Sequence, residues 1–370
     1  MSEAVSREPP KRVPPGTIEA QIAAILAAWG MEPDLVSTTV EAMAYCDRAG
    51  IDSHGISMLM MYEEGIRKGK IDVRARPRVV RQTAVTALVD AGAGLGHPAA
   101  VAAMRLAMEK AASAGVGVVS VFNSHHFGAA GYYAALAPER GLVGLVTSST
   151  RDFKVLPTRS ATPLLGTNPI AFAAPARRNR PFLLDMSTST AAANKVKVYD
   201  YLQRALPEGW VVDERGEPVT DPACAMDYAW RSAEGGLTPL GGSPEGASHK
   251  GYGLAVMVQI LSSSLSGASF SPIRKRTRKE NAPDDIGHFF LALDPRAFRP
   301  EGALEADVDA VVDELHAARP VDPALPVLVA GDPEAQARAE RARAGVPVPQ
   351  ALAEKIRGVC ERCGAGYLLG

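Results

Sequence analysis

The sequence has little of what marks secreted, membrane-spanning or nucleic-acid-binding proteins. Four cysteines in 370 residues are too few for a disulfide-stapled scaffold. The 40 Lys and Arg residues nearly balance the 41 Asp and Glu residues, so the formal net charge is −1. This balance gives no electrostatic reason to bind nucleic acid or an anionic membrane. No stretch approaches the roughly 18 uninterrupted apolar residues that a membrane helix needs.

The start of the chain also lacks the features of a targeting signal. The first fifteen residues contain four prolines and no apolar core, so we expect neither a secretion signal nor a transit peptide. We interpret residues 1–16 as a disordered tail. The composition, 46% hydrophobic and 22% charged, is ordinary for a globular protein, and the length suffices for two or three domains. These features predict a cytoplasmic enzyme.

Hydrophobic periodicity predicts helical ends and a strand-rich middle. Apolar residues recur at helical spacing over 17–47, around a turn at Gly30, and a third helix is predicted from Asp52 to about Lys68. Strands are predicted at 85–89, 117–121, 144–147, 170–173, 182–184 and 286–293. Further helices are predicted at 98–114, 190–205, 251–265 and from 303 onward. Residues 207–249 are rich in Gly and Pro, so we expect irregular connections there.

One glycine-rich loop tests for a Rossmann dinucleotide site. That fingerprint needs G-x-G-x-x-G between a strand and a helix, with an acidic residue about 20 positions further on. The spacing here is Gly92-x-Gly94-x-Gly96, followed by His97, and the next strand ends at Asn123. We therefore interpret the loop as a glycine turn that connects strand to helix, and we predict no Rossmann domain.

Polar and reactive side chains cluster in five short segments, at residues 52–55, 123–128, 166–170, 184–190 and 249–253. His54, at a predicted helix start, fits a general base, although a capping pair beside an exposed histidine is an equal alternative. His125 and His126 follow a buried strand. Because neighbouring residues of a strand point to opposite sides, at most one of them faces a site.

The other three segments have both structural and functional interpretations. Thr167 and Asn168 lie in an Asn-Pro turn that enters a strand. Asp185 ends a strand before a run of hydroxyls, which fits either simple N-capping or a phosphate site at a helix N-terminus. Lys250 begins an apolar helix, where it can meet a phosphate or a carboxylate or remain solvated. Five such segments together favour an active site over packing alone.

Several long motifs resemble the malate/L-lactate dehydrogenase family of the second, non-Rossmann type. They are IDSHGIS (51–57), GVGVVSVFNSHHFGAAGYYA (115–134), LLGTNPIAFAAP (164–175), FLLDMSTSTAAANKV (182–196), LPEGWVVDERGEPVTDP (206–222), HKGYGLAVMVQILSSSLSGASF (249–270) and IGHFFLALDP (286–295). The resemblance spans about residues 17–348. Related enzymes act on ureidoglycolate, sulfolactate and piperideine-2-carboxylate.

The resemblance implies an α/β fold with a mostly antiparallel, seven-stranded, NAD(P)-binding sheet and a helical domain formed from both termini. We expect the helical domain at 17–80 with about 296–370. The NAD(P)-binding and catalytic domain is expected at 81–295, with an irregular or helical insertion at about 190–250. The resemblance further implies a homodimer with NAD or NADP as cofactor.

Site residues follow from the same resemblance. Ser53, His54 and Asp185 match a hydrogen-bonded relay of imine-reducing members, and His126 matches the general acid/base of hydroxy-acid members. The cofactor contacts match Ser149, Asp185, Met186, Ser187, Lys250, Gly331, Asp332 and Pro333. Thr167 and Asn168 belong to the substrate pocket.

Two positions depart from the family pattern. The family places Arg, which clamps the substrate carboxylate, where this chain has Met58, and a thioether cannot form such a bidentate pair. Lys250 and Arg151 are candidate replacements. The second departure is His125, where Asn is common in the family.

The expected reaction is hydride transfer between nicotinamide and C2 of a small 2-hydroxy acid, malate-like or lactate-like, or of a 2-imino acid. Alternatives are a cyclic ketimine reductase of the piperideine-2-carboxylate kind and a non-catalytic nucleotide-binding homologue. A metal-dependent hydrolase or lyase using Asp52, His54, His126 and His288 lacks any metal-binding spacing, so we expect no metal. Cys360 and Cys363 form a lone C-x-x-C, and the basic run 274–279 is interpreted as a solvated loop.

Overall fold

The computed structural model describes residues 10–370, apart from the side chains of Tyr201 and Leu202. Its contacts divide the chain into two units: the N-terminal part up to Lys68 with Asp332–Gly370, and Gly69–Gly331. We expected these boundaries near residues 80 and 296. Residues 69–80 and 296–331 instead group with the sheet, because the strand that begins at Arg78 pairs within it and Asp309 accepts hydrogen bonds from the backbone of Arg178 and Asn179.

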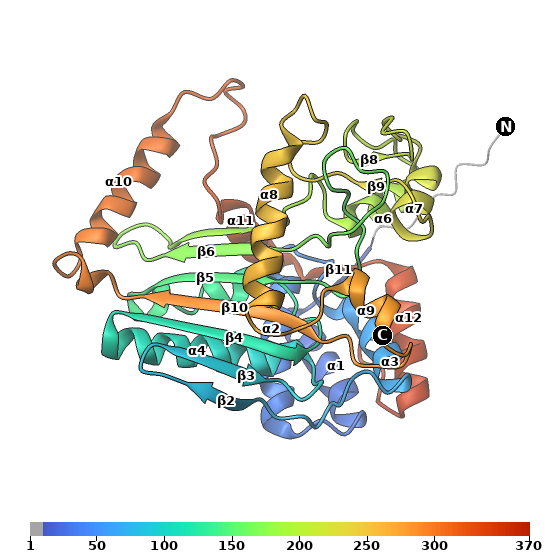
Figure 1. Cartoon of the computed structure of the whole chain (residues 1–370), viewed down its shortest axis with the longest axis horizontal. Helices are drawn as coiled ribbons and strands as arrows, with labels where there is room; N and C mark the ends of the chain where they lie inside the picture. The colour runs from blue at the N-terminus through green and yellow to red at the C-terminus, as the bar shows by residue number, and fades with distance from the viewer. Residues whose placement is uncertain (1–9) are drawn as a thin grey trace. The chain divides into compact units, whose positions relative to one another are not determined.

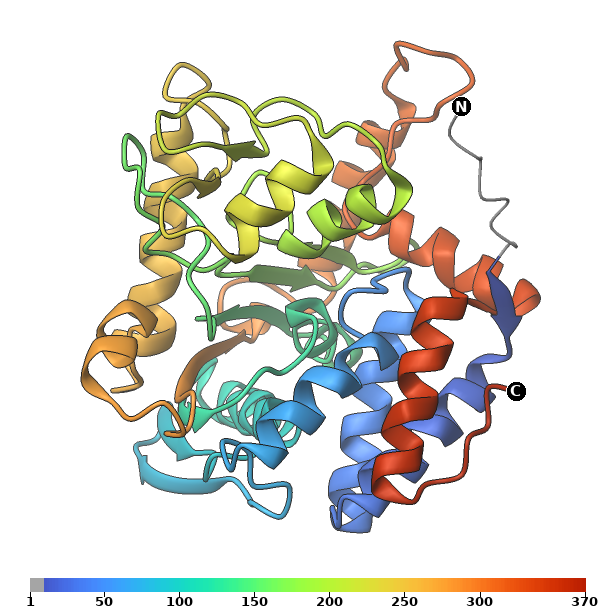
Figure 2. The ribbon, with the colours of Figure 1, turned by 90° about the vertical axis from the view of Figure 1, so that its right-hand side faces the viewer.

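Unit 1 is helical and combines both ends of the described chain. Its elements are β1 (Lys11–Val13), α1 (Pro15–Ala28), α2 (Pro33–Arg48), η1 (Ile56–Met58), α3 (Leu59–Arg67), α11 (Asp332–Ala344), β11 (Val346–Val348) and α12 (Gln350–Cys363). Figure 2 shows α12, in red, beside the blue N-terminal helices. Apolar residues of α1 such as Ile22 and Ile25 are fully buried. The periodicity thus gives the helices their packed faces.

Part of the expected tail has a defined place in unit 1. Residues 1–9 lie outside the described residues. Residues 10–16 do not form a tail: β1 pairs antiparallel with β11, and Pro15 begins α1. Val13 is buried, which explains why this short, polar segment is fixed.

Unit 2 contains a seven-stranded sheet in the order β2-β3-β4-β10-β5-β6-β7. The strands are β2 (Arg78–Gln82), β3 (Thr86–Asp90), β4 (Val116–Ser124), β5 (Val143–Ser148), β6 (Ile170–Ala174), β7 (Phe182–Met186) and β10 (Ile286–Leu293). Every neighbouring pair is antiparallel except β3 and β4, which are parallel. The predicted mostly antiparallel, seven-stranded α/β fold is confirmed, although the sheet is mixed.

Helices cover both faces of this sheet. On one face lie α4 (Gly96–Ala114) and α5 (Ala130–Ala134), and on the other lie α8 (Ser248–Gln259) and its π-helical continuation η3 (Ile260–Ser264). Strand β5 shows the alternation: a Cβ at Gly144 would contact Met104 of α4, whereas Thr147 hydrogen-bonds Ser262 of η3 at 2.8 Å. Figure 1 shows α8 in front of the strands and α4 behind them. The middle strands are therefore covered on both sides, as their apolar sequences require.

The segment between β7 and α8 holds more regular structure than we predicted. It contains α6 (Ala193–Leu202), β8 (Val211–Val212), α7 (Pro222–Trp230) and β9 (Gly236–Leu237). These elements share a hydrophobic core with Val155, Leu165 and Ala255. Helix α7 begins at a proline after Asp221, whose side chain accepts a hydrogen bond from the backbone of Cys224. This capped helix was hidden in a Gly- and Pro-rich sequence, so the prediction of irregular structure over 207–249 was wrong there.

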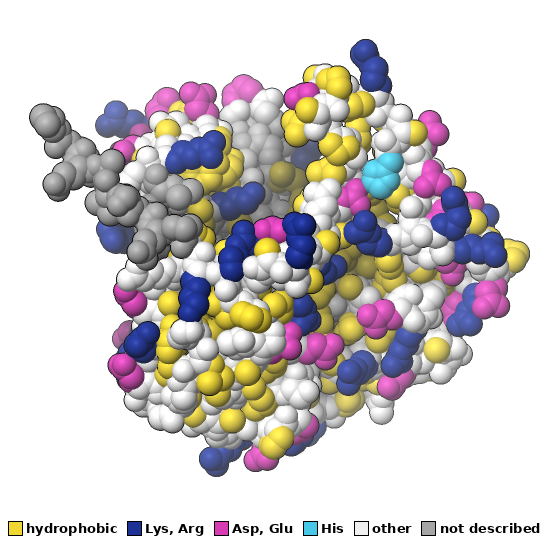
Figure 3. Space-filling model, turned by 180° about the vertical axis from the view of Figure 1, so that it is seen from behind, with side chains coloured by type: hydrophobic (Ala, Val, Ile, Leu, Met, Phe, Trp, Pro, Cys, Tyr) yellow, Lys and Arg dark blue, Asp and Glu magenta, His cyan; other side chains and the backbone are white. Residues whose placement is uncertain are grey.

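Unit 2 also contains three short elements, η2 (Pro138–Arg140), α9 (Ser271–Thr277) and η4 (Pro295–Ala297), and one longer helix, α10 (Ala303–Ala317). None of the helices within residues 10–370 has the length and apolarity to cross a bilayer. On the face shown in Figure 3, acidic and basic side chains are interspersed.

Candidate active site

In unit 1, the loop that carries Ser53 and His54 is fastened at both ends. Arg341 of α11 pairs with the carboxylate of Asp52, donating from Nη2 at 3.0 Å. At the other end, the buried Asp47 accepts a hydrogen bond from the backbone of Ile56 at 2.8 Å. We expected Asp52 and Ser53 to cap a helix, but their side chains are used in these contacts and neither η1 nor α3 has a side-chain cap.

Within this loop, Ser53 and His54, which we expected to belong to a relay, are hydrogen-bonded to each other. Ser53 Oγ lies 2.6 Å from His54 Nδ1. Burial lowers the pKa of His54 to about 4, so its imidazole is neutral at physiological pH. Met58 ends η1 and is half-buried. The relay's third member, Asp185, belongs to unit 2.

In unit 2, the loop after β4 holds its two histidines in different surroundings. His125 is buried, and its Nε2 lies 2.9 Å from Asp284. His126 is half-buried, its backbone oxygen accepts a hydrogen bond from Gly96, and its Nδ1 accepts one from the backbone of Gly128 at 3.3 Å. Of the two histidines, His126 is therefore the one that keeps part of its surface exposed.

A third histidine, His288 on β10, supports this loop from the sheet. Its two ring nitrogens are hydrogen-bonded to Ser148 at 2.8 Å and Ser124 at 2.9 Å, and its ring stacks on Phe127 at 4.4 Å. Burial lowers the pKa of His288 to about 3. Both nitrogens are thus engaged by serines, which leaves neither for a metal ion. No group of three or more metal-binding side chains occurs in the part of the chain that the structure describes.

The segments 166–170 and 184–190 meet beside α8. Thr188 donates hydrogen bonds to the backbone oxygens of Thr167 and Asn168, and the Asn168 amide donates to the backbone of Ala255 in α8 at 2.8 Å. Asn168 is fully buried with a φ of 34°, and its Oδ1 has no hydrogen-bond partner among the described residues. An acceptor buried in this way is costly unless a ligand donates to it.

Asp185 lies at the end of β7, against the start of α5. Its Oδ2 accepts a hydrogen bond from the backbone of Gly131 at 2.8 Å. A Cβ at position 131 would lie 2.7 Å from that oxygen, so only glycine leaves room for the carboxylate. Met186 and Ser187 follow and are half-buried. Asp185 thus caps α5 across the sheet rather than its own following segment.

The remaining predicted cofactor contacts in unit 2 lie at three places. Ser149 is buried and exchanges hydrogen bonds with the backbone of Gly287 at 3.0 and 3.2 Å. Lys250 is exposed in the first turn of α8. Gly331, with a φ of 100°, lies along the edge strand β7, where its Cβ would be 3.4 Å from Leu183. Asp332 and Pro333, which begin α11, belong to unit 1.

The comparisons decide the family. The family model described as malate/L-lactate dehydrogenase matches residues 13–357. The chain belongs to this family. It is 34% identical over 354 residues to malate dehydrogenase of Pyrococcus abyssi, which covers 95% of both chains. It is 36% identical over 260 residues to a pyrroline-2-carboxylate/piperideine-2-carboxylate reductase of Pseudomonas putida, covering 70% of this chain and 72% of the reductase.

The fold agrees with a solved member of the family. The crystal structure of malate dehydrogenase from Entamoeba histolytica matches with a TM-score of 0.91 at 29% identity, covering 96% of this chain and 99% of that one. The relatives are dehydrogenases and reductases, and this family member is an oxidoreductase, as we predicted.

Three buried residues around the family motifs escaped the sequence analysis: Asp47, Asp284 and Arg274. Arg274 belongs to the basic run that we interpreted as a solvated loop. It instead lies in α9, is buried, and donates hydrogen bonds to the backbone oxygens of Asp284 and Arg151. No local pattern predicts this, because Arg151 lies far away in the sequence. A run of charged residues along the sequence normally indicates a solvent-exposed segment.

Proposed function

We propose that this protein transfers hydride between NAD or NADP and C2 of a small 2-hydroxy acid or 2-imino acid. The observation that carries this proposal is the loop after β4, in which His126 alone of the two histidines is half-buried on a rigid support. A second candidate, reduction of a cyclic ketimine such as piperideine-2-carboxylate, is favoured by the Ser53–His54 hydrogen bond of 2.6 Å, which the proposed imine-reducing relay requires.

The residues present fit a nicotinamide cofactor. The buried Oδ1 of Asn168, which has no hydrogen-bond partner among the described residues, offers an acceptor to the amide group of a nicotinamide. Gly331 lies beside the edge strand β7 and carries no side chain that would block the approach of a cofactor to its backbone. We propose that Ser149, Asp185, Met186, Ser187, Lys250, Gly331, Asp332 and Pro333 hold the cofactor. The bound cofactor would supply the hydride acceptor or donor.

We propose that His126 moves the proton that accompanies hydride transfer. An alcohol is a poor hydride donor until its oxygen gains negative character, so a base must take the hydroxyl proton. The neutral imidazole takes this proton on an unprotonated ring nitrogen and becomes an imidazolium. In the reverse direction the imidazolium returns the proton to the substrate oxygen. Ser53, His54 and Asp185 are the proposed relay, while Thr167, Asn168 and Met58 are proposed to line the substrate pocket.

The first test is a fluorescence titration with NADH and with NADPH, which reads quenching of Trp29, Trp210 and Trp230 and the nicotinamide emission. Saturable binding of either nucleotide is expected, and the tighter one identifies the cofactor. Binding of neither to the folded protein would remove the oxidoreductase mechanism. Tight binding without turnover on a broad panel of hydroxy, keto and imino acids would instead favour a nucleotide-binding regulator.

The second test is His126→Ala, with turnover measured on the best substrate of that panel. We expect kcat to fall by about 10²-fold or more, the usual size of general acid/base catalysis. The exposed His316 of α10 provides the control variant His316→Ala, which should keep its turnover. If folded His126→Ala retains turnover, the proton-transfer role passes to His54.

We propose a homodimer and a cytoplasmic location as well. Along the outer side of α8 and η3, Met257, Ile260 and Leu265 are 37%, 53% and 57% exposed, and exposed apolar patches of this kind mark association surfaces. The four cysteines are free thiols, which fits a reducing compartment. Light scattering coupled to gel filtration tests the dimer: a monomeric mass at micromolar concentration would refute it.

A further inference from the structure

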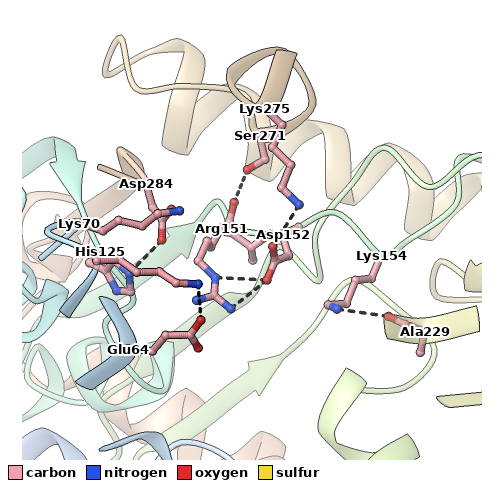
Figure 4. A network of polar contacts seen from close by, with 12 residues as sticks. Glu64, Lys70, His125, Arg151, Asp152, Lys154, Ala229, Ser271, Lys275 and Asp284 are labelled. Atoms are coloured by element: carbon pink, nitrogen blue, oxygen red, sulfur yellow. Dashed lines mark hydrogen bonds and ion pairs between the residues drawn. The ribbon is translucent and has the colours of Figure 1, made fainter. Parts of the chain in front are cut away.

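The most completely buried charged contact beside the proposed site joins His125 and Asp284. Their exposures are 1% and 3%, and His125 Nε2 lies 2.9 Å from Asp284 Oδ2 (Figure 4). His125 is the first residue of the loop after β4, and Asp284 lies in the loop that leads into β10. Removing one partner of a buried pair leaves the other without compensation, so such a pair fixes the two segments against each other.

Cationic side chains keep Asp284 ionised. Lys70 Nζ lies 3.6 Å from Asp284 Oδ1, and Arg274 Nη2 lies 3.9 Å from the same atom. Burial raises the pKa of Asp284, but His125, Arg151 and Arg274 together hold it below its usual value. Burial lowers the pKa of His125. The pair therefore places a neutral imidazole in close contact with an ionised carboxylate.

Asp285, the residue after Asp284, holds the same chain segment at Asn123. Asp285 Oδ1 accepts a hydrogen bond from the backbone of Asn123 at 2.8 Å, while its Oδ2 accepts one from Ser269 at 2.5 Å. Asn123 has a φ of 53°, so the chain turns sharply there. The two consecutive aspartates thus hold residues 123 and 125, and the residue that follows is His126.

We propose that the His125–Asp284 pair is a positioning device that fixes the backbone before His126 and so aims its imidazole at the substrate. This inference rests on the proposed role of His126. The pair itself takes no proton from the substrate, because both of its side chains are buried.

The test compares His125→Leu with His125→Gln. Leu removes the donor, whereas the Gln amide places an N–H near the position of imidazole Nε2. We expect His125→Leu to lower kcat by about 10- to 100-fold, as for a misplacement of about 1 Å at a reacting group, with KM and the cofactor Kd nearly unchanged. His125→Gln should recover most of kcat, because an amide donates a hydrogen bond but does not titrate. His316→Leu, at an exposed histidine of α10, is the matched control.

A mutant cycle with Asp284→Asn then tests whether the two residues act together. The double variant should be no slower than the slower single variant, because both changes break one contact. A wild-type kcat in His125→Leu, or additive losses in the double variant, would overturn the proposal. Failure of His125→Gln to recover kcat would indicate a proton relay and overturn it too.

One measurement does not depend on any variant folding. Long-range ¹H–¹⁵N spectra of the ¹⁵N-histidine-labelled wild-type protein report the tautomer of each imidazole, and the contact requires a neutral His125 with its proton on Nε2. A charged ring or an Nδ1–H tautomer would refute the pair. If the wild-type protein neither binds nucleotide nor turns over, the proposed function fails; if it is active and only the His125 results differ, the inference alone fails.

Discussion

Asp47 is a buried carboxyl group whose ionisation should weaken the fold as pH rises. It is 3% exposed on α2, accepts a hydrogen bond from the backbone of Ile56, and leaves no room for a side chain at Gly55, where a Cβ would lie 2.0 Å from its Oδ1. Burial raises its pKa from 3.8 to about 7, and Asp52 adds to this, while Ile56, Arg341 and Arg48 oppose it. The substitution Asp47→Asn keeps the acceptor oxygen and removes the titration.

The sign and size of the effect follow from proton linkage. Because the folded pKa lies above the unfolded one, the folded state binds more protons between pH 3.8 and about 7. The contribution of Asp47 to the free energy of unfolding is therefore greatest below pH 3.8. It falls by about 1.4 kcal/mol for each pH unit until about pH 7. When the pH rises from about 5.5 to about 8.5, the contribution of Asp47 changes only up to about pH 7, because the carboxyl group is ionised in both states above that. Its ionisation therefore lowers the free energy of unfolding by about 2 kcal/mol.

We therefore expect Asp47→Asn to gain about 2 kcal/mol relative to the wild type between these two pH values. Urea unfolding followed by tryptophan fluorescence measures this, with Trp29 as the only tryptophan of unit 1. Glu41→Gln removes an exposed carboxylate from the same helix and should show no such gain. An equal difference between Asp47→Asn and wild type at both pH values would refute the reasoning, because it would mean that Asp47 does not change its protonation in this range.

Two substitutions test the cofactor and substrate contacts. Gly131→Ala places a Cβ 2.7 Å from Asp185 Oδ2 and breaks the hydrogen bond between Asp185 and the α5 backbone. We expect the cofactor Kd to rise about tenfold, as for the loss of one charged hydrogen bond. An unchanged Kd in isothermal titration would remove Asp185 from the cofactor contacts. Met58→Arg introduces the arginine that the family resemblance implies as the clamp of the substrate carboxylate. The kcat/KM for malate or lactate should therefore rise by about tenfold or more. An unchanged kcat/KM would mean that another cation, such as Arg151, already holds the substrate carboxylate.

The sequence predicts six of the seven strands of the sheet, because these six are apolar runs with clear ends. The edge strand β2 (Arg78–Gln82) was missed, because it is charged and exposed along its whole length. Residues 286–293 were predicted as a strand and form β10 with those bounds. The structure brings the segment 184–190 beside Thr167 and Asn168, because Thr188 hydrogen-bonds to the backbone of both. Spacing along the chain does not show which loops meet in this way.

What escaped prediction depends on contacts between distant residues. Arg274 is buried because its guanidinium satisfies carbonyl oxygens of residues 151 and 284. Asp47 occupies an ordinary helical position, and only the fold shows that Gly55 leaves space for its carboxylate. Helix propensity and hydrophobic period describe neighbours along the chain, so partners of buried charges are outside their reach.

The glycine loop shows why a Rossmann-like pattern serves another purpose here. Strands β3 and β4 are parallel and joined through α4, which is the local topology of a dinucleotide site. In such a site the glycines let a phosphate approach the helix N-terminus. Here a Cβ at Gly96 would lie 2.4 Å from the backbone oxygen of His125 and 2.9 Å from that of His126, and the Gly96 N–H donates to His126 at 3.1 Å. The helix start thus donates to the carbonyl group of His126, so the glycine at the start of α4 supports the backbone of the proposed acid/base instead of a phosphate.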